Sequence, residues 1–192
     1  MPNHHLKPQD VLVACRQVLP GGEGLTQKQL AASLCLAPST VFASFQSLRR
    51  ARLVACPGTS AAAARARLLD FLVHGVPVVY LPVKTEVARG LATGIFSPHF
   101  RDRFAGARDI CLVWPYPRGR EVGEGLVPLY PSVPLACSRD PVFYQLVAAI
   151  DVLRVGRVRE KEAAATYLEE LFNLTSPRES SELDKSESGE AA

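Results

Sequence analysis

The chain has 192 residues, of which 47% are hydrophobic, a formal net charge of +3 and a mean hydropathy of +0.07. This length and apolar content suit one or two compact domains, and no apolar run reaches the roughly 18 residues of a membrane span. The polar N-terminus lacks the apolar segment of a secretory signal, so we expect a cytoplasmic protein without membrane helices.

Charge is distributed unevenly along the chain. Residues 1–120 carry 15 Lys or Arg and 6 Asp or Glu, whereas residues 121–192 carry 7 and 13. A basic first part followed by an acidic second part is typical of a chain whose N-terminal region binds a polyanion. Ordinary solvated charge gives the same pattern, so the distribution alone leaves both interpretations open.

The first predicted helix covers residues 8–18, where apolar residues recur at helical spacing. Pro20-Gly21-Gly22 then ends this helix. Thr26 and Gln29 have the spacing of a capping box, in which each side chain accepts a hydrogen bond from the other residue's backbone N–H. The pair therefore predicts the start of a second helix.

A third helix is predicted from Ser39, as its N-terminal cap, to about Arg52. A short strand over residues 53–55 follows, and Pro57-Gly58 stops it. A fourth helix is predicted over residues 60–74, with the glycine that follows as its C-terminal cap. This order of helices and strand is the pattern of a winged helix-turn-helix.

The second half of the chain predicts a smaller mixed α/β unit that ends in helices. Strands rich in β-branched and aromatic residues are predicted over 76–83 and 110–114, and the six prolines of residues 115–141 predict an irregular or short-stranded connection. Two helices are predicted over 141–154 and 157–172. Their apolar residues recur at helical spacing and are the expected surface of a homodimer: Val142, Leu146, Ile150, Leu153, Leu168 and Leu171.

The second and third helices have apolar residues that allow them to pack at a steep angle: Leu30, Ala31, Leu34, Leu36, Val41, Phe45 and Leu48. The opposite face of the third helix is then free, with small or hydroxylated side chains that can approach base edges and arginines near its end to contact phosphates. The expected DNA-binding residues are Gln27, Lys28, Ser39, Thr40, Ala43, Ser44, Ser47, Arg49, Arg50 and Arg52.

The segment QKQLAASLCLAPSTVFASFQSLRRARLV resembles the winged-helix regulators of the MarR-like group. The matching residues are Leu30-Ala31, Leu34-Cys35-Leu36, Ser39-Thr40-Val41 and Leu53-Val54. This resemblance implies a sequence-specific transcriptional regulator, a repressor acting as a dimer on double-stranded DNA. Cys35 stands where the group has a turn glycine, and no second wing strand follows Pro57-Gly58.

A weaker resemblance covers the segments FLVHGVPVVYLP, TEVARGLATG and LYPSVPLACSRDPVFYQLVAAIDVLRVGRVRE. These are similar to prokaryotic proteins with an N-terminal winged helix, some of which resemble antitoxins of the abortive-infection class. The resemblance implies a repressor with a possible protein partner. The alternative function is therefore an antitoxin-like or complex-bound subunit that holds a partner protein through residues 75–172.

The expected organisation is a winged-helix DNA-binding domain over 1–74, a mixed α/β assembly or partner-binding domain over 75–173, and a disordered acidic tail over 174–192. The five cysteines have no C-x-x-C spacing, and no titratable cluster has the spacing of a nucleophile with its base. We therefore expect no enzyme, no metal and no cofactor.

Overall fold

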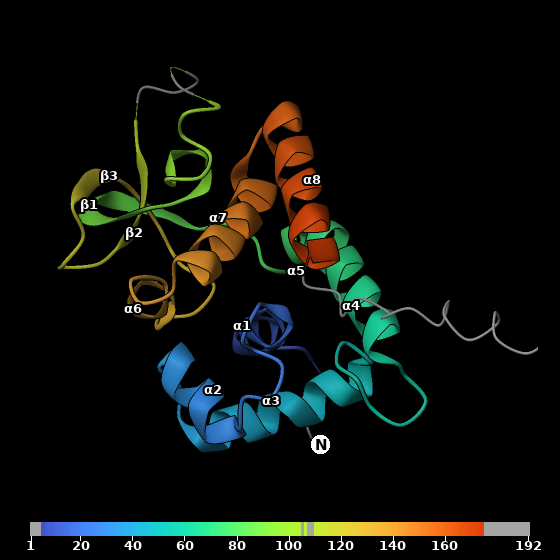
Figure 1. The fold of residues 1–192 in the computed structure, drawn as a ribbon. Helices are drawn as coiled ribbons and strands as arrows, with labels where there is room; N and C mark the ends of the chain where they lie inside the picture. The colour runs from blue at the N-terminus through green and yellow to red at the C-terminus, as the bar shows by residue number, and fades with distance from the viewer. Residues whose placement is uncertain (1–4, 105, 107–109, 175–192) are drawn as a thin grey trace, which may run out of the picture.

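The computed structural model describes residues 5–104, 106 and 110–174, and it has a mixed α+β fold (Figure 1). The helices of the first part are α1 (Pro8–Val18), α2 (Gln27–Leu34), α3 (Pro38–Ala51) and α4 (Ala61–Asp70). A π-helical turn (Phe71–Gly75) joins α4 to α5 (Val76–Val79). The strands are β1 (Lys84–Ala92), β2 (Leu112–Pro115) and β3 (Glu121–Leu126), with a short 3-10 helix at Gly94–Phe96; then follow α6 (Val133–Cys137), α7 (Pro141–Val155) and α8 (Val158–Leu174).

Helix α1 lies at the centre of the helical part and contacts α2, α3 and α7 (Figure 1). Five consecutive side chains of α1, residues 11–15, are buried, so the helix is covered on all sides rather than along one stripe. The bounds Pro8–Val18 confirm the first predicted helix. The capping box that begins α2 is also confirmed, since Gln29 N donates to Thr26 Oγ1 at 3.3 Å and Thr26 N donates to Gln29 Oε1 at 2.9 Å.

The three strands lie beside α6 and α7, and each strand pairs with the other two (Figure 1). Strand β1 runs antiparallel to both β2 and β3, which are parallel to each other. The predicted strand at 110–114 is confirmed in part as β2, and β3 is a short strand within the connection over 115–141 that was predicted to be irregular or short-stranded. Gly123 allows β3 to pair, because a Cβ there would lie 2.1 Å from the backbone oxygen of Cys111 and the close strand approach requires glycine.

The predicted strand over 76–83 is wrong. Residues 71–79 continue the helical path of α4, and residues 81–83 belong to neither a helix nor a strand. Gly75 is therefore not a C-terminal cap, and its φ of −88° is not left-handed. A short apolar run does not distinguish a buried helical segment from a strand by its periodicity, which is the reason for the error.

Helices α7 and α8 pack against each other, and they confirm the two predicted terminal helices (Figure 1). The predicted dimer stripe is used inside the chain, since five of its six side chains are buried: Leu146, Ile150, Leu153, Leu168 and Leu171. Only Val142, 38% exposed, remains accessible among them. A dimer must therefore use another surface.

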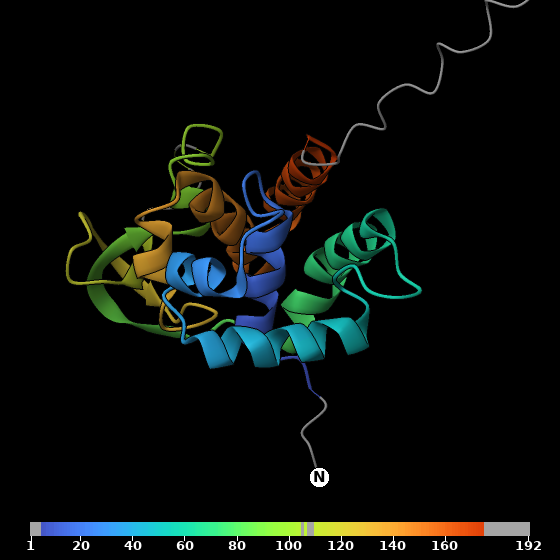
Figure 2. The same ribbon diagram turned by 60° about the horizontal axis from the view of Figure 1, so that its bottom comes forward.

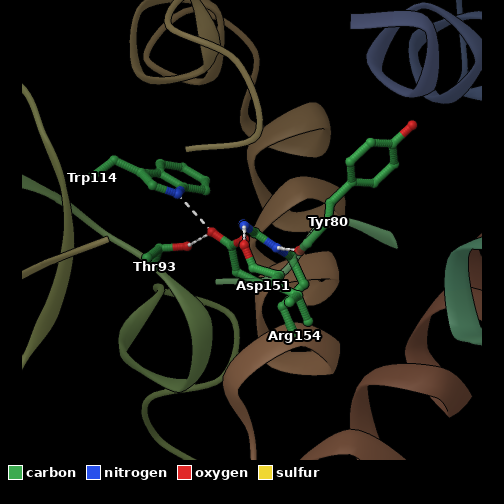
Figure 3. A network of polar contacts seen from close by, with 6 residues as sticks. Tyr80, Thr93, Trp114, Asp151 and Arg154 are labelled. Atoms are coloured by element: carbon green, nitrogen blue, oxygen red, sulfur yellow. Dashed lines mark hydrogen bonds and ion pairs between the residues drawn. The ribbon is translucent and has the colours of Figure 1, made fainter. Parts of the chain in front are cut away.

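A buried polar network ties α7 to the sheet and to the segment after α5 (Figure 3). The Asp151 carboxylate accepts hydrogen bonds from Thr93 Oγ1 at 2.9 Å and from Trp114 Nε1 at 2.6 Å. Its other oxygen accepts from Arg154 Nη1 at 2.6 Å, and Arg154 Nε donates to the carbonyl oxygen of Tyr80 at 2.8 Å. Burial raises the pKa of Asp151, while Arg154 and the other two donors oppose that rise.

One hydrophobic cluster includes side chains from Val11 to Phe172. It draws on both predicted domains, 1–74 and 75–173, and the boundary between them falls in the π-helical turn. The division into two domains stays a prediction. The predicted tail over 174–192 lies outside the described residues, apart from Leu174, which ends α8.

Candidate nucleic-acid interface

Helices α2 and α3 are joined by the three residues 35–37, and their axes are bent by 107°. Cys35 makes the sharp turn in the left-handed conformation, with φ 55° and ψ 42°. This conformation costs a residue with a Cβ atom about 1–2 kcal/mol relative to glycine. The buried side chains Leu34 and Leu48 hold the two helices together.

Among the residues that the structure describes, no other helix or strand covers the outer face of α3. Figure 2 shows α3 across the front of the lower edge, with α1 and α2 behind it. Val41, Ser44 and Leu48 form the buried stripe of α3, whereas residues on the opposite side are exposed. A helix held on one side and uncovered on the other has the access that insertion into a major groove requires.

A groove of about 510 Å³ runs along α3 and is bordered by the residues that begin α1. We call it the α3 groove. Its lining consists of Lys7, Gln9, Asp10, Ser39, Thr40, Phe42, Ala43, Ser44, Gln46, Ser47 and Arg50. Small, hydroxyl and amide side chains dominate this set, and the cations Lys7 and Arg50 also line it. Asp10 is buried and its Oδ2 atom accepts a hydrogen bond from Lys7 N at 2.9 Å, so this carboxylate is engaged in the cap of α1.

The structure brings five of the ten predicted DNA-binding residues together as accessible side chains along this groove: Ser39, Thr40, Ala43, Ser47 and Arg50. Four others are exposed but do not line it: Gln27 and Lys28 in the first turn of α2, and Arg49 and Arg52 at the end of α3. Arg52 is also the C-terminal cap of α3, with a φ of 58°.

Ser44 is the predicted contact that the structure contradicts. Its side chain borders the α3 groove, but the residue is only 1% exposed and Oγ has no hydrogen-bond partner among the described residues. The spacing explains this burial, because Ser44 lies three residues after Val41 and four before Leu48, on the stripe that faces α1. Ser44 therefore packs α3 onto the core and offers almost no surface for a contact.

Ser39 is also not the N-terminal cap of α3. The helix begins at Pro38, its cap is Ala37, and no side chain supplies a capping hydrogen bond there. Proline suits the first helical position, since its missing N–H would have no intrahelical partner and its φ is already helical. Ser39 consequently lies inside the first turn, where its hydroxyl remains exposed.

Five residues of the groove were not predicted from the sequence: Gln9 and Asp10 of α1, and Lys7, Phe42 and Gln46. Phe42 is 55% exposed, Gln46 lines the groove one turn before Arg50, and Lys7 approaches from the segment that precedes α1. Gln46 could have been found from its helical spacing to Ala43 and Arg50. Lys7 could not, because no local pattern places it beside a helix thirty residues later.

The predicted strand over 53–55 does not form. Leu53 and Val54 are buried without strand pairing, and a single bridge joins Cys56 to Thr59 around the turn at Pro57-Gly58. Cys56 N donates to the carbonyl oxygen of Thr59 at 3.1 Å, and Thr59 N donates back at 2.8 Å. This segment is a tight turn, too short to provide a second set of groove contacts as a wing.

Among the described residues, no single helix has the length and apolar composition needed to cross a membrane, although α2 and α3 taken together across their bend meet both requirements. No protein family, curated protein or solved structure matches the chain.

Proposed function

We propose that this chain is a sequence-reading DNA-binding protein, a transcriptional regulator in which α2 and α3 act as a helix-turn-helix. The observation that carries the proposal is the uncovered face of α3, on which small polar side chains lie beside Lys7 and Arg50. Small side chains let a helix approach base edges, hydroxyl and amide groups read them, and nearby cations contact phosphates. The bend of 107° is within the range found in helix-turn-helix motifs.

Selection from a library of random DNA duplexes tests this function. The full chain should enrich one sequence motif, and its affinity for the enriched duplex should exceed that for an unselected duplex by about 10³-fold or more. Affinity should also fall steeply with salt, because phosphate contacts release counterions. Failure to enrich any motif, with equal binding to both duplexes, would contradict the proposal.

Arg50 is expected to contact a phosphate rather than a base. It lies near the end of α3, exposed at one end of the α3 groove, where the DNA backbone passes a recognition helix. Arg50→Ala should therefore weaken binding to all duplexes alike and reduce the salt dependence of log K by about one unit. The measurement is a salt titration of binding by fluorescence anisotropy.

The matched control for this prediction is Arg67→Ala, which removes an exposed arginine from α4, away from the groove. It should leave both affinity and salt dependence unchanged. An Arg50→Ala variant that lost preference for the enriched motif but kept its salt dependence would assign Arg50 to base recognition instead.

A homodimer is part of the proposal, because one recognition helix reads few base pairs and two-fold symmetry doubles the contacts. With the α7–α8 stripe buried, the exposed apolar side chains at the end of α5 and just after it are the better surface for it: Val78, Val79, Leu81 and Val83. Val127 extends this surface, since its N–H donates to the carbonyl oxygen of Val83 at 2.9 Å. Light scattering should give a dimer for the full chain and a monomer for Leu81→Glu.

The same exposed side chains also favour the alternative function, a subunit that holds a partner protein through residues 75–172. The two functions differ in what the purified chain does alone. A monomer that enriches no DNA motif would favour the partner-binding subunit. A dimer that enriches a motif with two-fold symmetry would favour the regulator.

A further inference from the structure

A second cavity, of about 430 Å³, is lined by residues of the sheet and of helices α6 and α7. These elements lie on a different part of the molecule from α3 (Figure 1). Three arginines and one carboxylate line it, namely Arg101, Arg118, Arg120 and Glu121, together with Ser138 and Tyr144. We call it the arginine pocket. Its volume is in the range of small-molecule sites, roughly 300–1,000 Å³.

The turn that carries two of these arginines is firmly placed. Tyr116 N donates to the carbonyl oxygen of Arg89 at 3.0 Å, and Gly119 N donates to the carbonyl oxygen of Tyr116 at 2.9 Å. A Cβ at Gly119 would lie 2.0 Å from the backbone oxygen of Gly90, so only glycine allows this approach to β1. Arg118 and Arg120 therefore flank a turn that is packed on the sheet rather than a free loop.

The opposite wall is equally fixed. Tyr144 extends from α7, and its hydroxyl donates to the carbonyl oxygen of Ala92 at 2.5 Å, which joins α7 to the end of β1. Ser138 Oγ donates to the carbonyl oxygen of Leu135 at 2.8 Å at the end of α6. The pocket is thus a preformed space between packed elements. The protein therefore loses less conformational entropy when a ligand binds there.

The charge of the arginine pocket selects its ligand class. None of its three arginines forms an ion pair with a carboxylate in the part of the chain that the structure describes. Set against the single Glu121, they leave two positive charges, which match the roughly −1.5 to −2 of a phosphate monoester at neutral pH. Guanidinium groups also present paired N–H donors that suit phosphate oxygens.

We propose that the arginine pocket binds a phosphorylated small molecule. This ligand would also regulate DNA binding. That part of the proposal rests on the proposed function and on one route through the structure. Residues 139 and 140 follow Ser138 directly: Arg139 Nη1 donates to Cys35 Sγ at 3.6 Å, and Asp140 Oδ2 lies 3.1 Å from Arg16 Nε. A ligand that contacts Ser138 would therefore act on the residues that touch the turn between α2 and α3 and helix α1.

Inorganic pyrophosphate is a suitable probe, titrated into the full chain by calorimetry at low ionic strength. We expect one site with a Kd of about 1 mM or tighter, and weaker binding of succinate, whose carboxylates accept fewer hydrogen bonds. The double variant Arg118→Ala/Arg120→Ala should lose at least about tenfold in affinity. The matched control Arg157→Ala/Arg159→Ala removes two exposed arginines at the start of α8 and should bind like the wild type.

Absence of pyrophosphate binding, equal binding by the double variant, or tighter binding of succinate would each overturn the proposed ligand class. Regulation of DNA binding is measured separately. Saturating pyrophosphate should change the affinity of the wild type for its enriched duplex more than it changes the affinity of the double variant for that duplex. An equal change in both proteins would overturn the proposed regulation of DNA binding. If the double variant instead lost DNA affinity without pyrophosphate, these arginines would belong to the DNA surface and the proposal would fail. Calorimetry needs no DNA, so it remains decisive even if the chain enriches no duplex.

Discussion

Asp151→Ala should lower the free energy of unfolding by about 3–5 kcal/mol, because it leaves the Arg154 guanidinium buried without its charge partner. It also removes the acceptor for Thr93 Oγ1 and Trp114 Nε1, both of which are buried (Figure 3). Urea denaturation followed by fluorescence measures the change. Trp114 is the only tryptophan of the chain and reports on this network directly.

The matched control is Glu124→Ala, which breaks the exposed pair between Lys84 Nζ and Glu124 Oε2 at 2.7 Å. Exposed pairs contribute at most about 1 kcal/mol, so this variant should unfold close to the wild type. If Asp151→Ala fails to fold, Asp151→Asn keeps the volume and an acceptor oxygen, and its loss should be smaller. An Asp151→Ala variant within about 1 kcal/mol of the wild type would show that the network is not a main source of stability.

The helical parts of the fold could be predicted because their signals are local. Apolar spacing defined α1, and the pair Thr26 and Gln29 marked the start of α2 through a capping box within one turn. The two terminal helices were found in the same way. The partner that each helix packs against is not encoded in its local sequence. Their apolar stripes therefore predict a dimer surface, although the structure buries these stripes within the chain.

The sheet was harder to predict because its determinants lie far apart in the sequence. Strand β3 contains Gly123 and Gly125, residues that weaken a strand by propensity and fit here only because neighbouring backbone and side chains approach closely. The run 76–83 has strand-like composition, but its first residues extend a helix and its last residues are exposed. In both places tertiary packing, rather than the amino-acid composition of the segment, determined the secondary structure.

The candidate DNA-binding face was predicted as a helix but not residue by residue. A periodicity of 3.6 assigns the centre of each face well and its margins poorly. Ser44 lies at such a margin and turns inward with Val41 and Leu48, whereas Gln46, left out of the prediction, lines the α3 groove. Gln46 has an amide that can donate to and accept from adenine, so the proposed DNA-binding face includes Gln46 in place of Ser44.

Ala43→Glu should reduce affinity for the enriched duplex by about a hundredfold or more. Ala43 is exposed on α3 and lines the α3 groove, so the new carboxylate would meet the negative potential of DNA at the contact surface. Glutamate is a good helix former, and an exposed position needs no repacking, so the fold should be retained. Ser44→Glu is unsuitable for this purpose, since it would bury a charge against the core.

The matched control is Ala66→Glu, the same substitution at an exposed position of α4 that does not line the groove. Both variants add one negative charge to the whole protein, so they share any general electrostatic loss and differ only in the placement of that charge. Binding is measured by anisotropy at one salt concentration, with thermal melting of both variants to verify folding. If Ala43→Glu and Ala66→Glu lost affinity equally, the effect would come from net charge alone, and α3 would not be the element that reads DNA.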